Sequence, residues 1–217
     1  MKKAIIFDMD GVLVESAGVV FKSFNKVLEK YDVEIIPGDR ARYLGRSLRD
    51  QLSMWKEDYP KIPRELTCDE FSKEALGYQL EMMEERLKPD DVILKFIDDA
   101  KKQGLKTAVA TSSVRRRAEI FLEKRDIINR LDALVACEDV CNHKPHPDIF
   151  LEAAKKINVD PAECIVIEDA VNGIEAANKA GMTSVAKLNK FHTEEEFSEA
   201  NYVFSDFKDL KLEDISK

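Results

Sequence analysis

The 217-residue chain has 34 Lys and Arg against 42 Asp and Glu, a formal net charge of −8, and 44% of its residues are hydrophobic. This composition excludes a disordered chain, and the acidic balance disfavours nucleic acid as a partner because carboxylates repel a phosphate backbone. Since no apolar run reaches the roughly 18 residues of a membrane span, we expect a cytoplasmic protein with no membrane contact and no obligate protein partner.

The chain begins with a short apolar run, residues 4–7, which predicts a strand buried on both faces. Residues 16–86 then read as helical, with a turn at Pro37-Gly38 and an apolar stripe, which includes Phe21 and Phe24, that we interpret as a helix-packing face. Further on, strands and helices alternate. The predicted strands are residues 105–110, 131–136, 164–167 and 183–186, and the predicted helices are 92–102, 114–124, 147–157 and 171–180.

This alternation is typical of a parallel sheet covered by helices on both faces. The first strand needs the same sheet, so the helical stretch after it is expected to be an insertion. The sequence therefore predicts an α/β fold, with an open, parallel, Rossmann-like sheet, helices on both faces and an inserted small α-helical domain.

Polar side chains follow four of the predicted strands. In an open parallel sheet, ligands bind beyond the carboxyl ends of the strands, so these side chains are expected to share one site. They are Asp8, Asp10 and Gly11 after the first strand, Thr111, Ser112 and Ser113 after the second, Lys144 after the third, and Glu168 and Asp169 after the fourth.

These residue types suit the transfer of a phosphoryl group to a carboxylate. Several acids can hold a hard cation such as Mg²⁺, while a hydroxyl group and a lysine can hold phosphate oxygens. One carboxylate is then free to attack phosphorus, and a second can donate a proton to the leaving alcohol and later take one from water. Each motif alone has an ordinary explanation, such as a turn or a helix N-cap, and the prediction rests on their order after successive strands.

Four segments resemble the four motifs of the haloacid dehalogenase superfamily: residues 7–13, 111–113, 144–148 and 168–174. The most similar subgroup is that of the β-phosphoglucomutase-like phosphatases, which carry a helical cap between the first two motifs. The resemblance covers nearly the whole chain and is looser in the cap. It implies a catalytic core domain of residues 1–14 and 88–217 and a cap domain of residues 15–87.

The resemblance also implies a role for each matching residue. Asp8 matches the nucleophile and Asp10 the general acid and base, while Thr111 and Lys144 match the phosphate-binding hydroxyl group and the neutralising lysine. The expected Mg²⁺ ligands are Asp8, the backbone carbonyl of Asp10, and Asp169, with Glu168 beside them. The expected contacts to substrate are Gly11, Ser112, Ser113, Arg46 and Arg49.

The resemblance leaves two reactions open. The mutases of the family carry a His on the first cap helix, where this chain has Val20, and an Arg after the Gly-x-Ser of the cap motif, where Leu48 follows Ser47. We therefore expect Mg²⁺-dependent hydrolysis of a small phosphorylated metabolite, with sugar phosphates among the candidates, through an aspartyl-phosphate. The alternative is a β-phosphoglucomutase that interconverts β-glucose 1-phosphate and glucose 6-phosphate. Arg46 and Arg49 have a second interpretation, as solvent-facing charges on a helix.

Two other functions, a phosphoacceptor and a zinc site, match parts of the sequence. A non-enzymatic phosphoacceptor, such as a receiver module, also places Asp, Thr or Ser, and Lys at strand ends, but it gives Asp10 no role. Zinc is disfavoured because the spacing of Cys137, Cys141, His143 and His146 fits none of the familiar ligand patterns.

Residues 115–117, three consecutive arginines, are interpreted as the start of a helix, and one of them is a candidate to hold the loop at 111–113. The single tryptophan, Trp55, is predicted to pack inside the cap.

Overall fold

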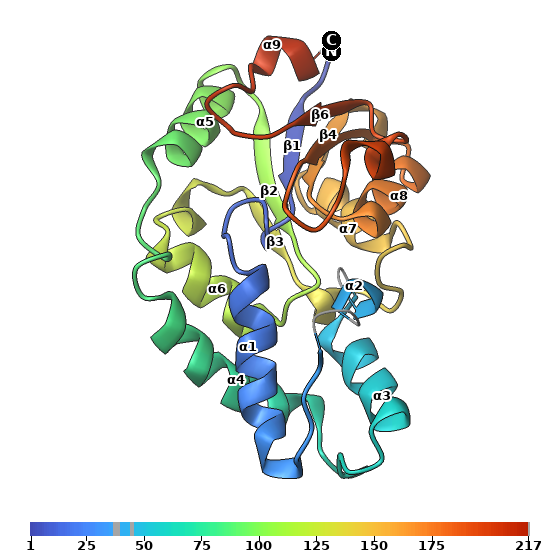
Figure 1. Ribbon diagram of the computed structural model, residues 1–217. Coiled ribbons are helices and arrows are strands. Elements are labelled where there is room, and N and C mark those ends of the chain that lie inside the picture. The colour runs from blue at the N-terminus through green and yellow to red at the C-terminus, as the bar shows by residue number, and fades with distance from the viewer. Residues whose placement is uncertain (37–39, 44–45, 217) are drawn as a thin grey trace.

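The structure is a computed structural model that describes residues 1–36, 40–43 and 46–216 (Figure 1). Within these residues, six strands form one parallel sheet in the order β3-β2-β1-β4-β5-β6. The strands are β1 (Ala4–Phe7), β2 (Lys106–Ala110), β3 (Ala133–Val135), β4 (Cys164–Glu168), β5 (Thr183–Lys187) and β6 (Tyr202–Phe204). The predicted turn at Pro37-Gly38 and Gly45 of the cap motif lie outside the described residues.

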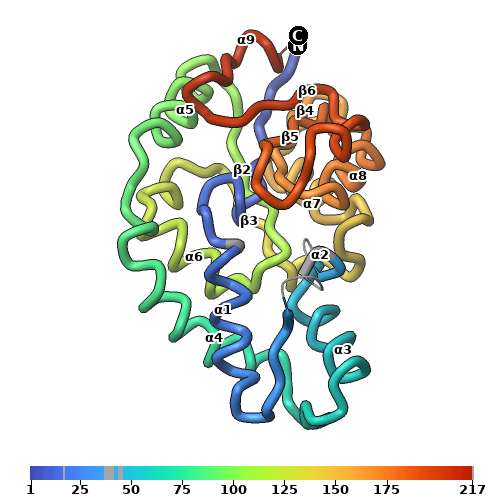
Figure 2. The backbone as a smooth tube through the Cα atoms, in the orientation of Figure 1, coloured from blue at the N-terminus to red at the C-terminus, as the bar shows by residue number. Residues whose placement is uncertain are grey.

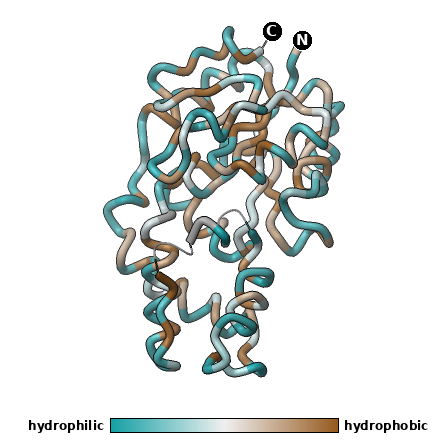
Figure 3. Tube along the Cα trace, turned by 45° about the vertical axis from the view of Figure 1, so that its right-hand side comes forward, coloured by the Kyte–Doolittle hydropathy of each residue, from teal (hydrophilic) through white to brown (hydrophobic). Residues whose placement is uncertain are grey.

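Helices cover both faces of the sheet, as predicted (Figure 1). On one face lie α5 (Asp91–Lys102) and α6 (Arg115–Lys124), and on the other α7 (Asp148–Lys156) and α8 (Val171–Lys179). Successive strand residues point to opposite faces. Ile5 and Phe7 therefore pack in the cluster on the α5–α6 side, whereas Ala4 and Ile6 pack in the cluster on the α7–α8 side. Figure 3 shows apolar stretches in the middle of the upper part of the molecule, where the sheet lies.

The predicted strands agree with β1 to β5 to within two residues at each end. The sequence prediction did not include β6, because a strand of three residues is too short to show a periodicity. Its first two side chains are half-buried and the third is buried, and the strand pairs only with β5, at the edge of the sheet. The remaining helix at this end of the chain is α9 (Leu212–Ile215).

The segment between β1 and β2 is helical, as predicted. Its helices are α1 (Ala17–Leu28), α2 (Arg40–Tyr43), α3 (Leu48–Asp58) and α4 (Cys68–Met83). They lie beyond the carboxyl ends of the strands, at the lower end of the molecule in Figures 1 and 2. Short 3₁₀ helices complete the described structure: η1 (Glu29–Tyr31), η3 (Ile128–Arg130), η4 (Cys137–Asp139), η5 (Pro161–Glu163) and η6 (Glu194–Phe197).

The inserted helices have a hydrophobic cluster of their own. At its centre Trp55, which is fully buried, packs against Phe24 and Phe71 with ring centroids 5.4 and 5.7 Å away. The prediction that Trp55 packs inside the inserted region is confirmed. Val19 and Met83 of the insertion pack instead in the cluster on the sheet, so the helices are also anchored to the core. The domain boundaries after residues 14 and 87 stay a prediction, which this separate cluster supports.

Among the described residues, the structure contains no helix that is both long enough and apolar enough to cross a membrane.

Candidate active site

The loop after β1 is a tight turn that places two aspartates at the edge of the sheet. The amide of Asp8 still donates to the carbonyl of Ile167 on β4 at 2.8 Å, so Asp8 is fixed by the sheet itself. Gly11 has a φ of +84°, and a Cβ there would stand 1.8 Å from Asp169 Oδ2. Both the positive φ and the close contact require glycine. This glycine therefore lets the first motif lie directly against the fourth.

Lys144 lies between two buried carboxylates. Its Nζ donates to Asp8 Oδ1 at 2.6 Å and to Glu168 Oε1 at 2.7 Å, and its side chain is only 1% exposed. Burial raises the pKa of Asp8 to about 7, with Glu168 and Asp10 adding to the shift and Lys144 opposing it. Burial lowers the pKa of Lys144, but the charges of Asp8 and Glu168 outweigh burial and raise it above its usual value. Lys144 is therefore a permanent cation beside Asp8.

Asp169 faces the same site from the loop after β4. Asn189 Nδ2 donates to its Oδ2 at 3.0 Å, and burial, together with the charges of Glu168 and Asp8, raises its pKa well above the usual value. Buried carboxylates whose charge is incompletely balanced favour a cation, and their oxygens are the ligands that Mg²⁺ prefers. The oxygens of Asp8 and Asp169 therefore fit a Mg²⁺ site.

No group of three or more His, Cys, Asp or Glu side chains in the described parts of the chain is gathered closely enough to hold a metal ion by itself. Lys144 lies between Asp8 and Glu168, and Asp10 is bound to Arg117 instead. A Mg²⁺ ion at this site would accordingly share its coordination with backbone, water and phosphate oxygens, which is usual for this ion.

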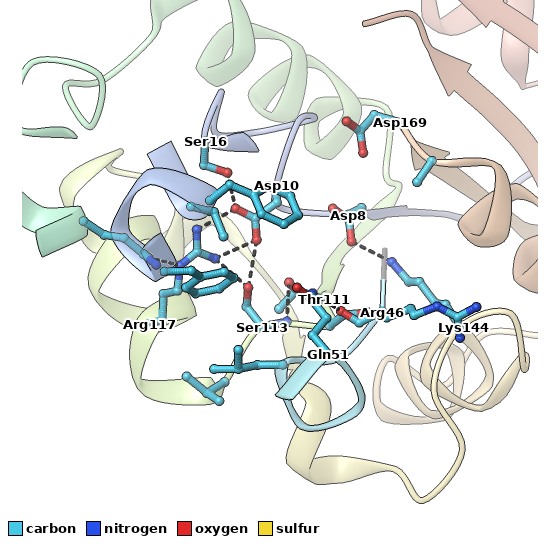
Figure 4. A pocket seen from close by; sticks show the side chains of 18 of the residues that line it. Asp8, Asp10, Ser16, Arg46, Gln51, Thr111, Ser113, Arg117, Lys144 and Asp169 are labelled. Carbon is cyan, nitrogen blue, oxygen red and sulfur yellow. Dashed lines mark hydrogen bonds and ion pairs between the residues drawn. The ribbon is translucent and has the colours of Figure 1, made fainter. Parts of the chain in front are cut away.

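Asp10 is held by four hydrogen bonds. Arg117 donates to both of its oxygens, from Nη1 to Oδ2 at 2.6 Å and from Nη2 to Oδ1 at 2.7 Å. Ser113 Oγ donates to Oδ2 at 2.8 Å, and Ser16 Oγ donates to Oδ1. Burial raises the pKa of Asp10, but the charge of Arg117 and these hydrogen bonds outweigh burial and bring it below its usual value. Figure 4 shows this network beside Asp8.

The hydroxyl groups after β2 form a compact loop. The amide of Thr111 donates to Val135 of β3 at 3.0 Å, and Thr111 Oγ1 accepts a hydrogen bond from the amide of Ser113 at 3.1 Å. Thr111 is 1% exposed but lies in the lining of the pocket. A helix, α6, begins directly after this loop, and its N-cap residue Val114 lines the same pocket as the acids.

An open pocket joins these residues, with an empty volume of about 1010 Å³ including the space at its mouth. Most of the predicted site residues line it: Asp8, Asp10, Arg46, Thr111, Ser112, Ser113, Lys144, Glu168 and Asp169. Of the described residues predicted to bind substrate, Gly11 and the exposed Arg49 are not in this lining.

The pocket also contains residues that sequence reasoning missed. Gln51 and Gln79 come from the inserted helices, and Asn189, Phe191 and His192 from the loop after β5. None of them belongs to a motif, so no local pattern identifies them. The stripe on α1 was interpreted only as a packing face, yet Val20, Phe21 and Phe24 line the pocket as well as the interior.

Comparison with known proteins agrees with this geometry. The profile of the haloacid dehalogenase-like hydrolases matches residues 5–187. The chain is 30% identical over 183 residues to the phosphorylated carbohydrates phosphatase of Thermotoga maritima, which covers 84% of this chain and 83% of that protein. It is 32% identical over 189 residues to the β-phosphoglucomutase of Bacillus subtilis, with 84% and 82% covered.

Among solved structures, a β-phosphoglucomutase from Clostridium difficile superposes with a TM-score of 0.86 at 30% identity and covers 99% of this chain and 96% of that one. The motifs, the parallel sheet with its helical insertion and the relatives all agree. The resemblance found in the sequence is thus confirmed, and the chain belongs to the haloacid dehalogenase-like hydrolases, an enzyme family whose members similar to this chain include phosphatases and β-phosphoglucomutases.

Proposed function

We propose that this protein is a Mg²⁺-dependent phosphatase that hydrolyses a small phosphorylated metabolite through a phosphoryl group carried on Asp8. The observation that carries the proposal is the position of Asp8, which is fixed to the sheet, faces an open pocket and has a buried lysine 2.6 Å away. A carboxylate attacks phosphorus well only when the negative charge around it is balanced. Lys144 supplies such a charge.

Asp10 transfers the proton in each half of the reaction. In the first half, an oxygen of Asp8 bonds to phosphorus and the ester bond breaks. Asp10 gives a proton to the leaving alcohol, and it must take up that proton from solvent beforehand because Arg117 and the hydrogen bonds to Asp10 lower its pKa. In the second, Asp10 takes a proton from the water that attacks phosphorus, and Asp8 is released. Thr111 and Lys144, which line the pocket, would bind phosphate oxygens. A bound Mg²⁺, held by Asp8, Asp169 and the carbonyl of Asp10, would balance charge on the phosphoryl group.

The side chains of two pocket residues favour hydrolysis over isomerisation. A mutase has to bind a sugar phosphate at both ends, yet Val20 and Leu48 bring apolar side chains to the pocket at the places where mutases carry His and Arg. The relatives support a phosphorylated carbohydrate as the substrate class, since one is named for phosphorylated carbohydrates and another is a β-phosphoglucomutase. β-Phosphoglucomutase activity is thus the second candidate.

The proposal is tested by phosphate release from 4-nitrophenyl phosphate and a panel of sugar phosphates. We expect release with Mg²⁺, loss of activity with EDTA and recovery when Mg²⁺ is added back. Asp8→Asn should abolish release, whereas the exposed Asp214→Asn should leave it unchanged. Activity that survives Asp8→Asn would reject Asp8 as the nucleophile. Conversion of β-glucose 1-phosphate to glucose 6-phosphate with little free phosphate would favour the mutase.

A further inference from the structure

The site contains two carboxylate–cation pairs, and the proposed reaction explains only one of them. Asp8 is paired with Lys144, and Asp10 is paired with Arg117. In Figure 4 the two acids lie side by side, with Lys144 beyond Asp8 and Arg117 beyond Asp10. Arg117 is only 6% exposed, so its charge is held inside the protein rather than in solvent. A buried cation of this kind needs a reason beyond stability, because burial is costly.

The contact between Arg117 and Asp10 fixes an orientation as well as a charge. The two nitrogens Nη1 and Nη2 each bind a different carboxylate oxygen, at 2.6 and 2.7 Å. A planar fork of this type sets the plane of the carboxylate, which a lysine cannot do. Arg117 Nη1 also donates to Ser113 Oγ at 2.5 Å. The Ser113 hydroxyl group, which donates to Asp10, is therefore held by the same arginine.

Arg117 is itself held from the inserted helices. Its Nε donates to Gln79 Oε1 of α4 at 2.6 Å, and Gln79 Nε2 donates to Ser23 Oγ of α1 at 2.8 Å. Gln79 is 2% exposed and Ser23 is fully buried, so water does not compete at these atoms. The guanidinium group also lies 4.3 Å from the ring centroid of Phe121 on its own helix. A continuous chain of hydrogen bonds therefore runs from Asp10 into the inserted helices.

We propose that Arg117 is a positioning residue that orients Asp10 for proton transfer, and that Gln79 holds Arg117 in place from the inserted helices. The inference rests on the proposed function, because Asp10 needs an orientation only if it exchanges protons with the leaving alcohol and with water. Both side chains line the pocket, but in this role each binds Asp10 or its holder Arg117 and not the phosphoryl group. Their effect passes entirely through Asp10.

The leaving group provides the test. Phenol is a weaker acid than 4-nitrophenol and needs a proton more as it departs, although the two phosphate esters have nearly the same shape. Loss of general-acid catalysis should therefore slow phenyl phosphate far more than 4-nitrophenyl phosphate. The quantity to measure is kcat/KM, which reports on the steps up to departure of the phenol.

We expect Arg117→Lys to lower kcat/KM for phenyl phosphate by about 10-fold or more, a part of the roughly 10²–10⁴-fold that a positioned acid contributes. For 4-nitrophenyl phosphate we expect less than about a 3-fold change, because Asp8 and Lys144 are untouched. Gln79→Met, which keeps the pair with Asp10 but removes the contact from α4, should show the same selectivity to a smaller degree. Arg116→Lys, at the exposed neighbour on α6, is the matched control and should match wild type.

Asp10→Asn should show the same selectivity, and adding Arg117→Lys to it should cause no further loss, because both changes remove one function. An equal fall on both esters, or an additive loss in the double variant, would overturn the inference. If Arg117→Lys does not fold by circular dichroism, Gln79→Met alone decides, and an unchanged ratio of the two esters is then the contrary result. Activity that survives Asp8→Asn would instead reject the proposed function, so the two failures are distinguishable.

Discussion

Lys144 and Arg117 show how two buried cations serve neighbouring acids in different ways. Lys144 is a point charge shared between Asp8 and Glu168, which suits an environment where charge moves from carboxylate to phosphoryl oxygens. Arg117 donates from two nitrogens to the carboxylate of Asp10 and so fixes the orientation of that carboxylate. The sequence could predict the first pair because Lys144, followed by Pro145 and Pro147, lies in a motif after a strand.

The pair of Asp10 and Arg117 could not be predicted from the sequence in the same way. The sequence predicts that residues 115–117 begin a helix, but three adjacent arginines do not show which one turns inward. The phase of the helix decides it, because Arg117 shares its buried face with Ala118 and Phe121, whereas Arg116 points to solvent. Gln79 lies far away in the sequence, so only the packing of α4 on α6 brings the two together.

Replacing Lys144 tests the first pair. Lys144→Met should leave Asp8 and Glu168 buried without a cation, and should lower the free energy of unfolding at neutral pH by about 3–5 kcal/mol, the usual cost of breaking a buried pair on one side. Phosphate release should be lost as well. Chemical denaturation checks the stability, with Lys155→Met, whose side chain is 78% exposed, as the control. A variant as stable as wild type would show that Lys144 does not compensate these acids.

At the scale of elements, the turns after strands bring the motifs together, and glycines decide how closely. Gly173 lies in the first turn of α8, where a Cβ would stand 2.0 Å from Glu168 Cδ. Glu168 cannot move aside easily, because Lys144 and the amides of Asp169 and Ala170 hold it at 2.7, 2.6 and 2.7 Å. The sequence predicted this helix, but only the structure shows the role of its glycine.

Two glycine-to-alanine substitutions in helices should therefore change the free energy of unfolding in opposite directions. Gly173→Ala should lower the free energy of unfolding by about 1–3 kcal/mol, as overpacking does, and should reduce phosphate release because Glu168 is displaced. Gly77→Ala on α4 has no atom within 4 Å of the new Cβ, and should raise stability by about 0.5–1 kcal/mol through helix propensity. Thermal or urea unfolding of both variants measures the difference. If the Gly173→Ala protein is as stable as the Gly77→Ala protein, a Cβ at position 173 does not crowd Glu168.

At the scale of the whole molecule, the sheet and the inserted helices differ in how well the sequence predicts them. The sheet follows from short apolar runs that alternate with helical periodicities, so its parallel, doubly covered form was predictable. The arrangement of the inserted helices depends on aromatic residues distant in sequence, such as Phe24, Trp55 and Phe71, which meet only in three dimensions. Helical periodicity predicts each helix there but not its partners, which is why Gln51 and Gln79 were missed in the pocket.

The separate aromatic cluster makes the proposed domain division testable. Trp55 is the only tryptophan, so its fluorescence reports on the inserted helices, while far-UV circular dichroism reports on the whole chain. Phe71→Ala removes a fully buried ring and should cost about 3–5 kcal/mol locally. We expect the fluorescence transition in urea to move to lower concentration than the main dichroism transition. Phe150→Ala, which removes a fully buried ring under the sheet, should move mainly the dichroism transition. If both probes stay coincident in both variants, the chain unfolds as one unit, and the boundaries after residues 14 and 87 do not separate independent domains.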